Sequence, residues 1–277
     1  MPAADKGGPA GAGADPRAGE DGRQRICGIP VYSGAHEKVL EAMERNIRGS
    51  RRPMYISITN TEAMYHARRD AGHREYIEKA RFSLCDGIGI VVGARLQGKC
   101  LRRFNGPLLL GMACHYGASR GWRHFFCGGK EGVATKLSAR LADQYPGLIC
   151  AGSFAPPFRP MTFAEEELML RAINEARPDI LWVGLGLPKQ ERFIAQYLDR
   201  LKVPWLVGVG AAFDMHAGTA HWAPPWIRSL GFEWLYRLCF EPRMLKRNLW
   251  SFICLADMLR EAARLRVISF RQGRAKT

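Results

Sequence analysis

Residues 180–191 read Ile-Leu-Trp-Val-Gly-Leu-Gly-Leu-Pro-Lys-Gln-Glu, and this stretch decides the fold class. Its first four residues are apolar and have the length of a buried strand. Gly184 and Gly186 permit a tight turn, and Pro188 suits the first turn of a helix, where an N–H would have no partner. A buried strand that turns at once into a helix predicts a βα unit.

The same alternation of short apolar runs and helical spacing continues on both sides of this unit. Thr162, with Glu165 three residues later, marks one helix start as a capping box. Strict alternation of strand and helix predicts an α/β fold with a mostly parallel sheet and helices on both faces. Strands are expected at 55–58, 81–84, 124–127, 148–150, 180–183 and 204–209, and helices at 61–79, 88–97, 107–119, 131–144, 162–176 and 189–201.

The two ends of the chain differ in composition from this alternating part. Residues 1–24 are rich in glycine, proline and charge and are expected to form a disordered tail. Residues 25–220 form the predicted α/β domain, and residues 221–277 a basic helical appendage rich in tryptophan and arginine. Such a segment is typical of a membrane-surface helix, and equally of a helix packed on the domain with a solvated basic face. Composition leaves both interpretations open.

The 277 residues carry a formal charge of +15, which favours polyanionic partners such as nucleic acid, anionic lipid or phosphorylated ligands. No cysteine pair has CxxC spacing and no cysteine stands at metal-ligand spacing with a histidine, so we expect reduced thiols, no metal and no cofactor. Neither a signal peptide nor an apolar run of about 18 residues is visible. A cytoplasmic protein, soluble or peripheral on the membrane, is expected.

Polar residues follow the expected strands, at the edge where parallel sheets bind ligands. Asp86 follows the strand that ends near Cys85, so its carboxylate is placed to take a proton from a hydroxyl. Thr59 and Asn60 close the preceding strand and could hydrogen-bond a sugar. Capping of the next helix is the alternative for each of these residues, and position alone favours it.

Further strands end in glycine-rich turns. Gly128 and Gly129 precede a helix, whose free amides could hold a diphosphate, although an ordinary strand–helix turn also uses glycine. Gln190 and Glu191 belong to the opening stretch and could bind hydroxyls and phosphate. Asp214 could accept hydrogen bonds from a nucleobase or ribose, or cap the next turn.

Arg103, next to Arg102, offers positive charge for a departing diphosphate, with a solvated arginine pair as the alternative. The chain has no DxD motif, with which many sugar transferases hold a divalent ion. Arginine and backbone amides would then meet the leaving-group charge, which predicts metal-independent chemistry. The absence of GxxxxGK[ST] disfavours an NTPase.

Ten short motifs occur in a fixed order along the chain. They are TNTE at 59–62, CDGIG at 85–89, ARLQG at 94–98, RFNG at 103–106, CGG at 127–129, YPG at 145–147, PDI at 178–180, GLGLPKQE at 184–191, GVGAAFD at 208–214 and EWLYRL at 233–238. Over roughly residues 55–247 this set resembles the WecG/TagA/CpsF glycosyltransferase family, and the two longest blocks make the resemblance specific.

The resemblance implies an inverting, metal-independent transferase with a Rossmann-like domain and a C-terminal appendage. It implies a UDP-sugar as donor and, as acceptor, a glycan linked to undecaprenyl diphosphate at the inner face of the bacterial membrane. The appendage is expected to bind the anionic membrane surface and to close over the site. The sequence leaves open whether the chain forms a homo-oligomer.

By position, the resemblance makes Asp86 the general base and Thr59 and Asn60 a polar substrate-binding pair, although the family's usual Thr-x-Asn spacing is here an adjacent Thr-Asn. The resemblance also implies roles for two further groups of residues. Donor-pocket positions fall on Arg103, Gln190 and Asp214, and basic residues of the appendage on Arg237 and Arg247.

Two other classes of function compete with this interpretation. A non-catalytic Rossmann-like protein that binds a nucleotide or nucleic acid would also carry positive charge and aromatic residues. The charge, however, concentrates in the C-terminal segment, and the crevice residues are carboxylates and amides, so we expect no nucleic acid partner. A dinucleotide-dependent oxidoreductase would need the full glycine fingerprint and an acidic residue at ribose distance, which the chain lacks.

Overall fold

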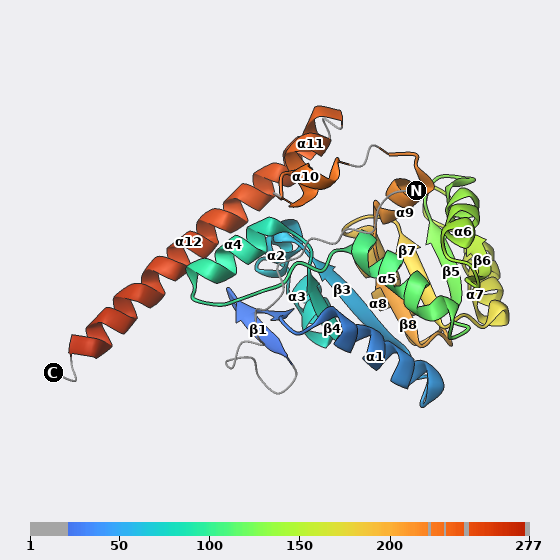
Figure 1. The fold of residues 1–277 in the computed structure, drawn as a ribbon, viewed down its shortest axis with the longest axis horizontal. Helices are drawn as coiled ribbons and strands as arrows, with labels where there is room; N and C mark the ends of the chain where they lie inside the picture. Colours follow the sequence, from blue (N-terminus) through green and yellow to red (C-terminus); the bar gives the residue numbers. More distant parts are fainter. Residues whose placement is uncertain (1–21, 221–222, 230, 241–243, 275–277) are drawn as a thin grey trace.

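The computed structural model of the protein describes residues 22–220, 223–229, 231–240 and 244–274. Its centre is a six-stranded sheet in the order β4-β3-β8-β7-β5-β6, and all neighbouring strands are parallel (Figure 1). The strands are β3 (Met54–Thr59), β4 (Phe82–Cys85), β5 (Arg123–Gly128), β6 (Ile149–Phe154), β7 (Ile180–Gly184) and β8 (Trp205–Gly208). Each strand overlaps one that the sequence predicts, although β6 runs four residues beyond the predicted end at 150, and the α/β class is confirmed.

Helices cover both faces of the sheet. Along β7, Ile180 and Trp182 are buried on one face and Leu181 and Val183 on the other. Because successive side chains of a strand point to opposite faces, a strand covered on both sides reads as a continuous apolar run. One face packs against α1 (His36–Arg48), α5 (Gly106–Ala118), α6 (Val133–Gln144) and α9 (Ala212–Ala217). The other packs against α2 (Thr61–Ala67), α3 (Ala71–Lys79), α4 (Ile88–Leu96), α7 (Phe163–Ala176) and α8 (Lys189–Tyr197).

The predicted capping box at Thr162 is present at the start of α7. The single helix expected at 61–79 is wrong, because the chain breaks between α2 and α3. Asp70 is the N-cap of α3, and its side chain accepts hydrogen bonds from the amides of Gly72 and His73. A carboxylate that satisfies free amides in this way starts a new helix in the middle of a continuous helical pattern.

Three elements near the N-terminus were not expected. Strands β1 (Arg23–Ile26) and β2 (Ile29–Tyr32) form an antiparallel hairpin, and α1 follows it. Arg23 and Gln24 therefore belong to a strand rather than to the tail predicted for residues 1–24. The rest of that tail, up to residue 21, lies outside the described residues.

The appendage comprises α10 (Pro225–Ser229), α11 (Glu233–Phe240) and α12 (Met244–Arg274). Helix α12 runs along α2 and α4 (Figure 1). Its Cys254 and Met258 are buried in the core, and Gly93 of α4 packs so closely on Met258 that a Cβ there would collide with it. This part of the appendage therefore packs on the domain, as one of the two sequence interpretations predicts.

Polar contacts fix the same helix–helix contact. The hydroxyl of Thr61 on α2 donates to the hydroxyl oxygen of Ser251 on α12 at 2.8 Å. Asp257 of α12 forms ion pairs with Arg68 at 3.7 Å and Arg69 at 3.5 Å, just beyond α2. Within the described ranges, no helix combines the length and the apolar character needed to cross a membrane.

Candidate active site

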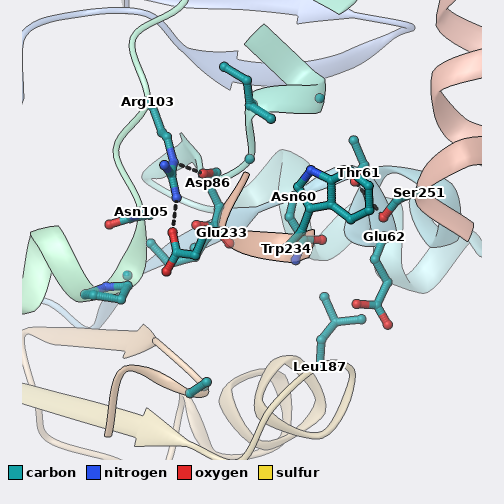
Figure 2. A pocket seen from close by; sticks show the side chains of 18 of the residues that line it. Asn60, Thr61, Glu62, Asp86, Arg103, Asn105, Leu187, Glu233, Trp234 and Ser251 are labelled. Carbon is teal, nitrogen blue, oxygen red and sulfur yellow. Dashed lines mark hydrogen bonds and ion pairs between the residues drawn. The ribbon is translucent and has the colours of Figure 1, made fainter. Parts of the chain in front are cut away.

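A cavity of about 360 Å³ lies between the carboxyl ends of the sheet strands and the appendage (Figure 2). The strand ends contribute Ile58 and Gly208, while α11 and α12 contribute the opposite lining. The cavity's polar and charged lining residues are Asn60, Thr61, Glu62, Asp86, Arg103, Asn105, Gln190, Glu233, Trp234, Asn248 and Ser251. The site is thus built jointly by the α/β domain and the appendage.

The first turns of several helices line this cavity. The starting residues of α2, α4, α5 and α9 are among the lining, and α8 contributes its second residue, Gln190. The first amides of a helix lack partners within the helix, and the helix dipole places partial positive charge at the same end. A convergence of such ends favours an anionic ligand such as a phosphate.

Backbone hydrogen bonds place Asp86 directly at the end of the sheet. Its amide donates to the carbonyl oxygen of Thr59 at 2.9 Å, which continues the pairing of β3 with β4. The N-cap position of α4 is held by Gly87, so Asp86 does not occupy the cap that the alternative interpretation assigned to it. Asp86 lines the cavity, as expected for a residue that meets a ligand.

Arg103 connects the end of β4 to the appendage (Figure 2). Its Nε donates to the carbonyl oxygen of Asp86 at 2.8 Å, and one terminal nitrogen lies 2.6 Å from the Glu233 carboxylate on α11. Its other terminal nitrogen donates to the carbonyl oxygen of Arg228 at 3.2 Å. The end of β4 also holds the loop that carries Arg103, because the amide of Phe104 donates to the carbonyl oxygen of Cys85 at 2.7 Å.

Cys85 is the thiol nearest to Asp86 in the sequence. Burial, together with the neighbouring Asp86 charge, raises the pKa of this thiol to about 12. Cys85 is therefore neutral near pH 7 and is not an activated nucleophile.

Of the predicted polar pair, only Asn60 lines the cavity. Its side-chain oxygen accepts a hydrogen bond from the amide of Ala63 at 2.8 Å, so the predicted helix cap is present as well. Thr59 is fully buried, and its hydroxyl lies 2.8 Å from that of Ser83 and 3.2 Å from that of Ser57. Thr59 sits between strands and does not reach the cavity.

Gln190 lines the cavity from the first turn of α8, and its Nε2 donates to the Glu191 carboxylate at 3.1 Å. Gly208 makes room for it, since a Cβ at that position would lie 2.9 Å from the Gln190 amide. Glu191 is buried behind Gln190 and is not part of the cavity lining. Its place is that of a residue that holds Gln190.

Three other predicted residues lie outside the cavity lining. Gly128 has a φ of 129°, and a Cβ there would lie 2.7 Å from the backbone of Gly184, so close strand packing requires glycine. Gly129 donates its amide to the carbonyl oxygen of Gly184 at 3.0 Å. Asp214 accepts a hydrogen bond from the Thr219 hydroxyl at 3.1 Å, within a local turn. The turn interpretation of these positions fits the structure, and the diphosphate cradle expected at Gly128 and Gly129, which lie outside the cavity lining, stays a prediction.

Arg237 and Arg247 belong to α11 and α12, but their side chains lie outside the described residues. Among the described side chains, no three of His, Cys, Asp or Glu gather in a way that could hold a metal ion.

Sequence reasoning missed several residues of the cavity. Glu62 and Asn105 belong to the quoted motifs TNTE and RFNG but were assigned no site role, although their place after a strand or before a helix could have identified them. Glu233, Trp234, Asn248 and Ser251 come from the appendage. Glu233 and Trp234 belong to the quoted motif EWLYRL but were assigned no site role. No local pattern marks Asn248 and Ser251, because only the docking of α12 brings them to the cavity.

Comparison with known proteins gives a consistent result. The model of the Glycosyl transferase WecG/TagA/CpsF family matches residues 24–267. A Bacillus subtilis (strain 168) protein named N-acetylglucosaminyldiphosphoundecaprenol N-acetyl-beta-D-mannosaminyltransferase is 29% identical over 231 residues, which cover 82% of this chain and 87% of that protein. Proteins of the same name from Bacillus spizizenii and Staphylococcus aureus (strain NCTC 8325 / PS 47) are 29% and 27% identical, and each match covers 70% of this chain and 74% or 75% of the relative.

Proposed function

Because the chain belongs to the WecG/TagA/CpsF family of glycosyl transferases, we propose that it moves a sugar from a UDP-sugar to a polyprenyl-diphosphate-linked acceptor in the synthesis of a cell-surface or exopolysaccharide. The relatives' name specifies an N-acetylglucosaminyl-diphosphoundecaprenol acceptor, and this chain's acceptor belongs to the same chemical class. The observation that carries the proposal is the shared cavity, in which Asp86, Arg103 and Gln190 meet at the strand ends.

In the proposed reaction, Asp86 takes the proton from an acceptor hydroxyl as that oxygen attacks the anomeric carbon. The new glycosidic C–O bond forms while the bond between the anomeric carbon and the UDP oxygen breaks, and its electron pair leaves with UDP. A single displacement inverts the anomeric configuration. Sugar nucleotides of UDP are commonly α-linked, so the beta linkage in the relatives' names agrees with inversion in those proteins.

The charge that develops on UDP needs positive partners. Arg103 and the starts of α4, α5 and α8 supply them at the cavity, and oriented amides are effective there because they need no reorganisation during the reaction. We therefore propose metal-independent transfer, with the diphosphate near Arg103. A non-catalytic nucleotide-binding protein would use the same helix starts, but it would not need a carboxylate beside them.

The direct test is transfer by the purified chain. It should transfer sugar from at least one UDP-hexose or UDP-N-acetylhexosamine to a polyprenyl-diphosphate-linked N-acetylglucosamine, with an unchanged rate after treatment with EDTA. Product analysis by mass spectrometry and by the anomeric proton coupling checks both the transfer and the inversion. A protein that binds UDP but transfers nothing from the whole panel would support the non-catalytic alternative.

The appendage is proposed to hold the enzyme on the cytoplasmic, anionic face of the membrane where the acceptor resides. Several large apolar side chains on it are exposed: Trp226, Phe232, Leu235, Leu245, Leu249 and Phe252. Leu245, Leu249 and Phe252 follow helical spacing on one side of α12. Apolar side chains combined with a basic segment fit an interfacial helix.

Changing Trp226 and Leu249 together to serine should weaken binding to vesicles of phosphatidylglycerol and phosphatidylcholine by about tenfold or more, because each exposed side chain loses its burial in the lipid interface. Both are exposed, by 64% and 57%, so the fold should tolerate the change. The matched control is Phe163 and Leu168 of α7, exposed by 77% and 61%, changed in the same way. Equal sedimentation of the two double variants with vesicles would argue against the appendage as the membrane contact.

A further inference from the structure

The cavity has two chemically different sides. Asp86, Arg103 and Glu233 gather on one side, while Thr61, Glu62, Ser251 and Leu187 lie on the other (Figure 2). The second side is the contact between α2 and α12, which the Thr61–Ser251 hydrogen bond closes at 2.8 Å. We call it the α2–α12 seam.

Asn248 belongs to the seam by its position on α12. It stands three residues before Ser251 and seven before Leu255, so the three share one side of the helix, and all of them line the cavity. Only 7% of Asn248 is exposed, and its Nδ2 is buried without a hydrogen-bond partner among the described residues. An unpaired buried amide costs folding free energy, so its presence at a cavity wall points to a ligand that pairs with it.

Glu62 supplies the complementary group. It follows Thr61 in the first turn of α2, and only 4% of it is exposed although it lines the cavity. A carboxylate oxygen can accept a hydrogen bond, whereas the Asn248 Nδ2 donates one. Leu187, Phe252 and Leu255 add an apolar wall to the same part of the cavity. The seam thus offers one donor, one acceptor and an apolar surface.

We propose that the α2–α12 seam is a subsite for the acetamido group of an N-acetylated sugar, with Asn248 as a specificity-determining residue. An acetamido group has a carbonyl oxygen for Asn248, an N–H for Glu62 and a methyl group for the apolar wall. A plain hydroxyl lacks the methyl group and would leave the apolar wall unfilled. The inference rests on the proposed function for its choice of a sugar ligand.

The test compares binding of acetamido and hydroxyl sugars by isothermal titration. The donor pairs are UDP-N-acetylglucosamine with UDP-glucose and UDP-N-acetylmannosamine with UDP-mannose. The acceptor pair is the N-acetylglucosaminyl and glucosyl diphosphate of a short polyprenol. The wild type should prefer the acetamido member of at least one pair by about tenfold, the value of one well-placed hydrogen bond. The pair that shows the preference tells whether the donor or the acceptor fills the seam.

Asn248→Leu should reduce this preference to less than about threefold, because it removes the pairing amide. It should leave the melting temperature of the unliganded protein unchanged or higher, since an unpaired buried group is lost. Asn248→Asp keeps the shape but replaces the donor by an acceptor, and it should lose the preference as well. Leu259→Ala, at an exposed position of α12 outside the cavity lining, should keep it.

Two results would overturn the inference: a wild type that binds both members of every pair equally, or an Asn248→Leu variant that keeps the preference. A lower melting temperature with unchanged preference would likewise mark Asn248 as structural. The transfer assay separates this inference from the proposed function. If the protein shows an Asn248-dependent preference but transfers no sugar, only the proposed function is refuted. If the enzyme is active and its preference does not depend on Asn248, only the seam subsite is refuted.

Discussion

Replacing Asp86 by asparagine is expected to lower kcat by about a thousandfold, within the range that a positioned general base contributes. Asparagine has the same shape as aspartate but does not take up the acceptor's proton. The backbone contacts of residue 86, to Thr59 and to the Arg103 guanidinium, do not depend on the side chain and should persist. The measurement is the initial rate at saturating donor and acceptor, with UDP affinity by titration calorimetry and folding by circular dichroism.

Glu62→Gln is the matched control for this change. Glu62 is a second carboxyl group of the same cavity, so both variants replace a carboxyl group there by an amide. If Asp86 is the base, Glu62→Gln should retain a much larger fraction of kcat than Asp86→Asn. Equal losses in the two variants would mean that the cavity needs negative charge rather than a base at position 86, and ordinary turnover by Asp86→Asn would exclude it as the base.

The fold could be predicted from the sequence where strands are buried on both faces. The apolar run at 180–183 became β7, because neither side of that strand meets water and every position therefore carries an apolar residue. The hairpin of β1 and β2 lacks such a signal. Its turn places Cys27 and Gly28 at φ values of 48° and 78°, and a cysteine is not the residue type that indicates this left-handed conformation.

Site residues could be predicted where one strand end determines their place. Asp86 and Gln190 each follow a strand by a few residues, so parallel pairing brings them to the same edge of the sheet. At Gly128 the sequence does not distinguish two explanations. A glycine at a strand end can serve either close packing of the strands or access of a ligand to the backbone. Asn248 shows a second limit, since its role depends on α12 docking against α2, which no local pattern encodes.

Arg103→Ala is expected to reduce kcat/KM by about a hundredfold, mainly through weaker binding of the donor, because it removes a charged hydrogen-bond donor from the diphosphate. The guanidinium pairs with Glu233 at 2.6 Å and with the carbonyl oxygens of Asp86 and Arg228. An arriving diphosphate would compete with Glu233 for the same terminal nitrogen. The measurements are the KM of the UDP-sugar and the dissociation constant of UDP.

Glu233→Gln separates the two roles that Arg103 could have. If Arg103 binds the diphosphate, this variant should bind UDP as tightly as the wild type or more tightly, since it frees the guanidinium from its carboxylate partner. If Arg103 serves only to tie α11 to the end of β4, the two variants should lose activity to a similar extent, because both break the same ion pair. Parallel losses would therefore refute diphosphate binding by Arg103, whereas tight UDP binding by Glu233→Gln together with weak binding by Arg103→Ala would place the leaving group at this guanidinium.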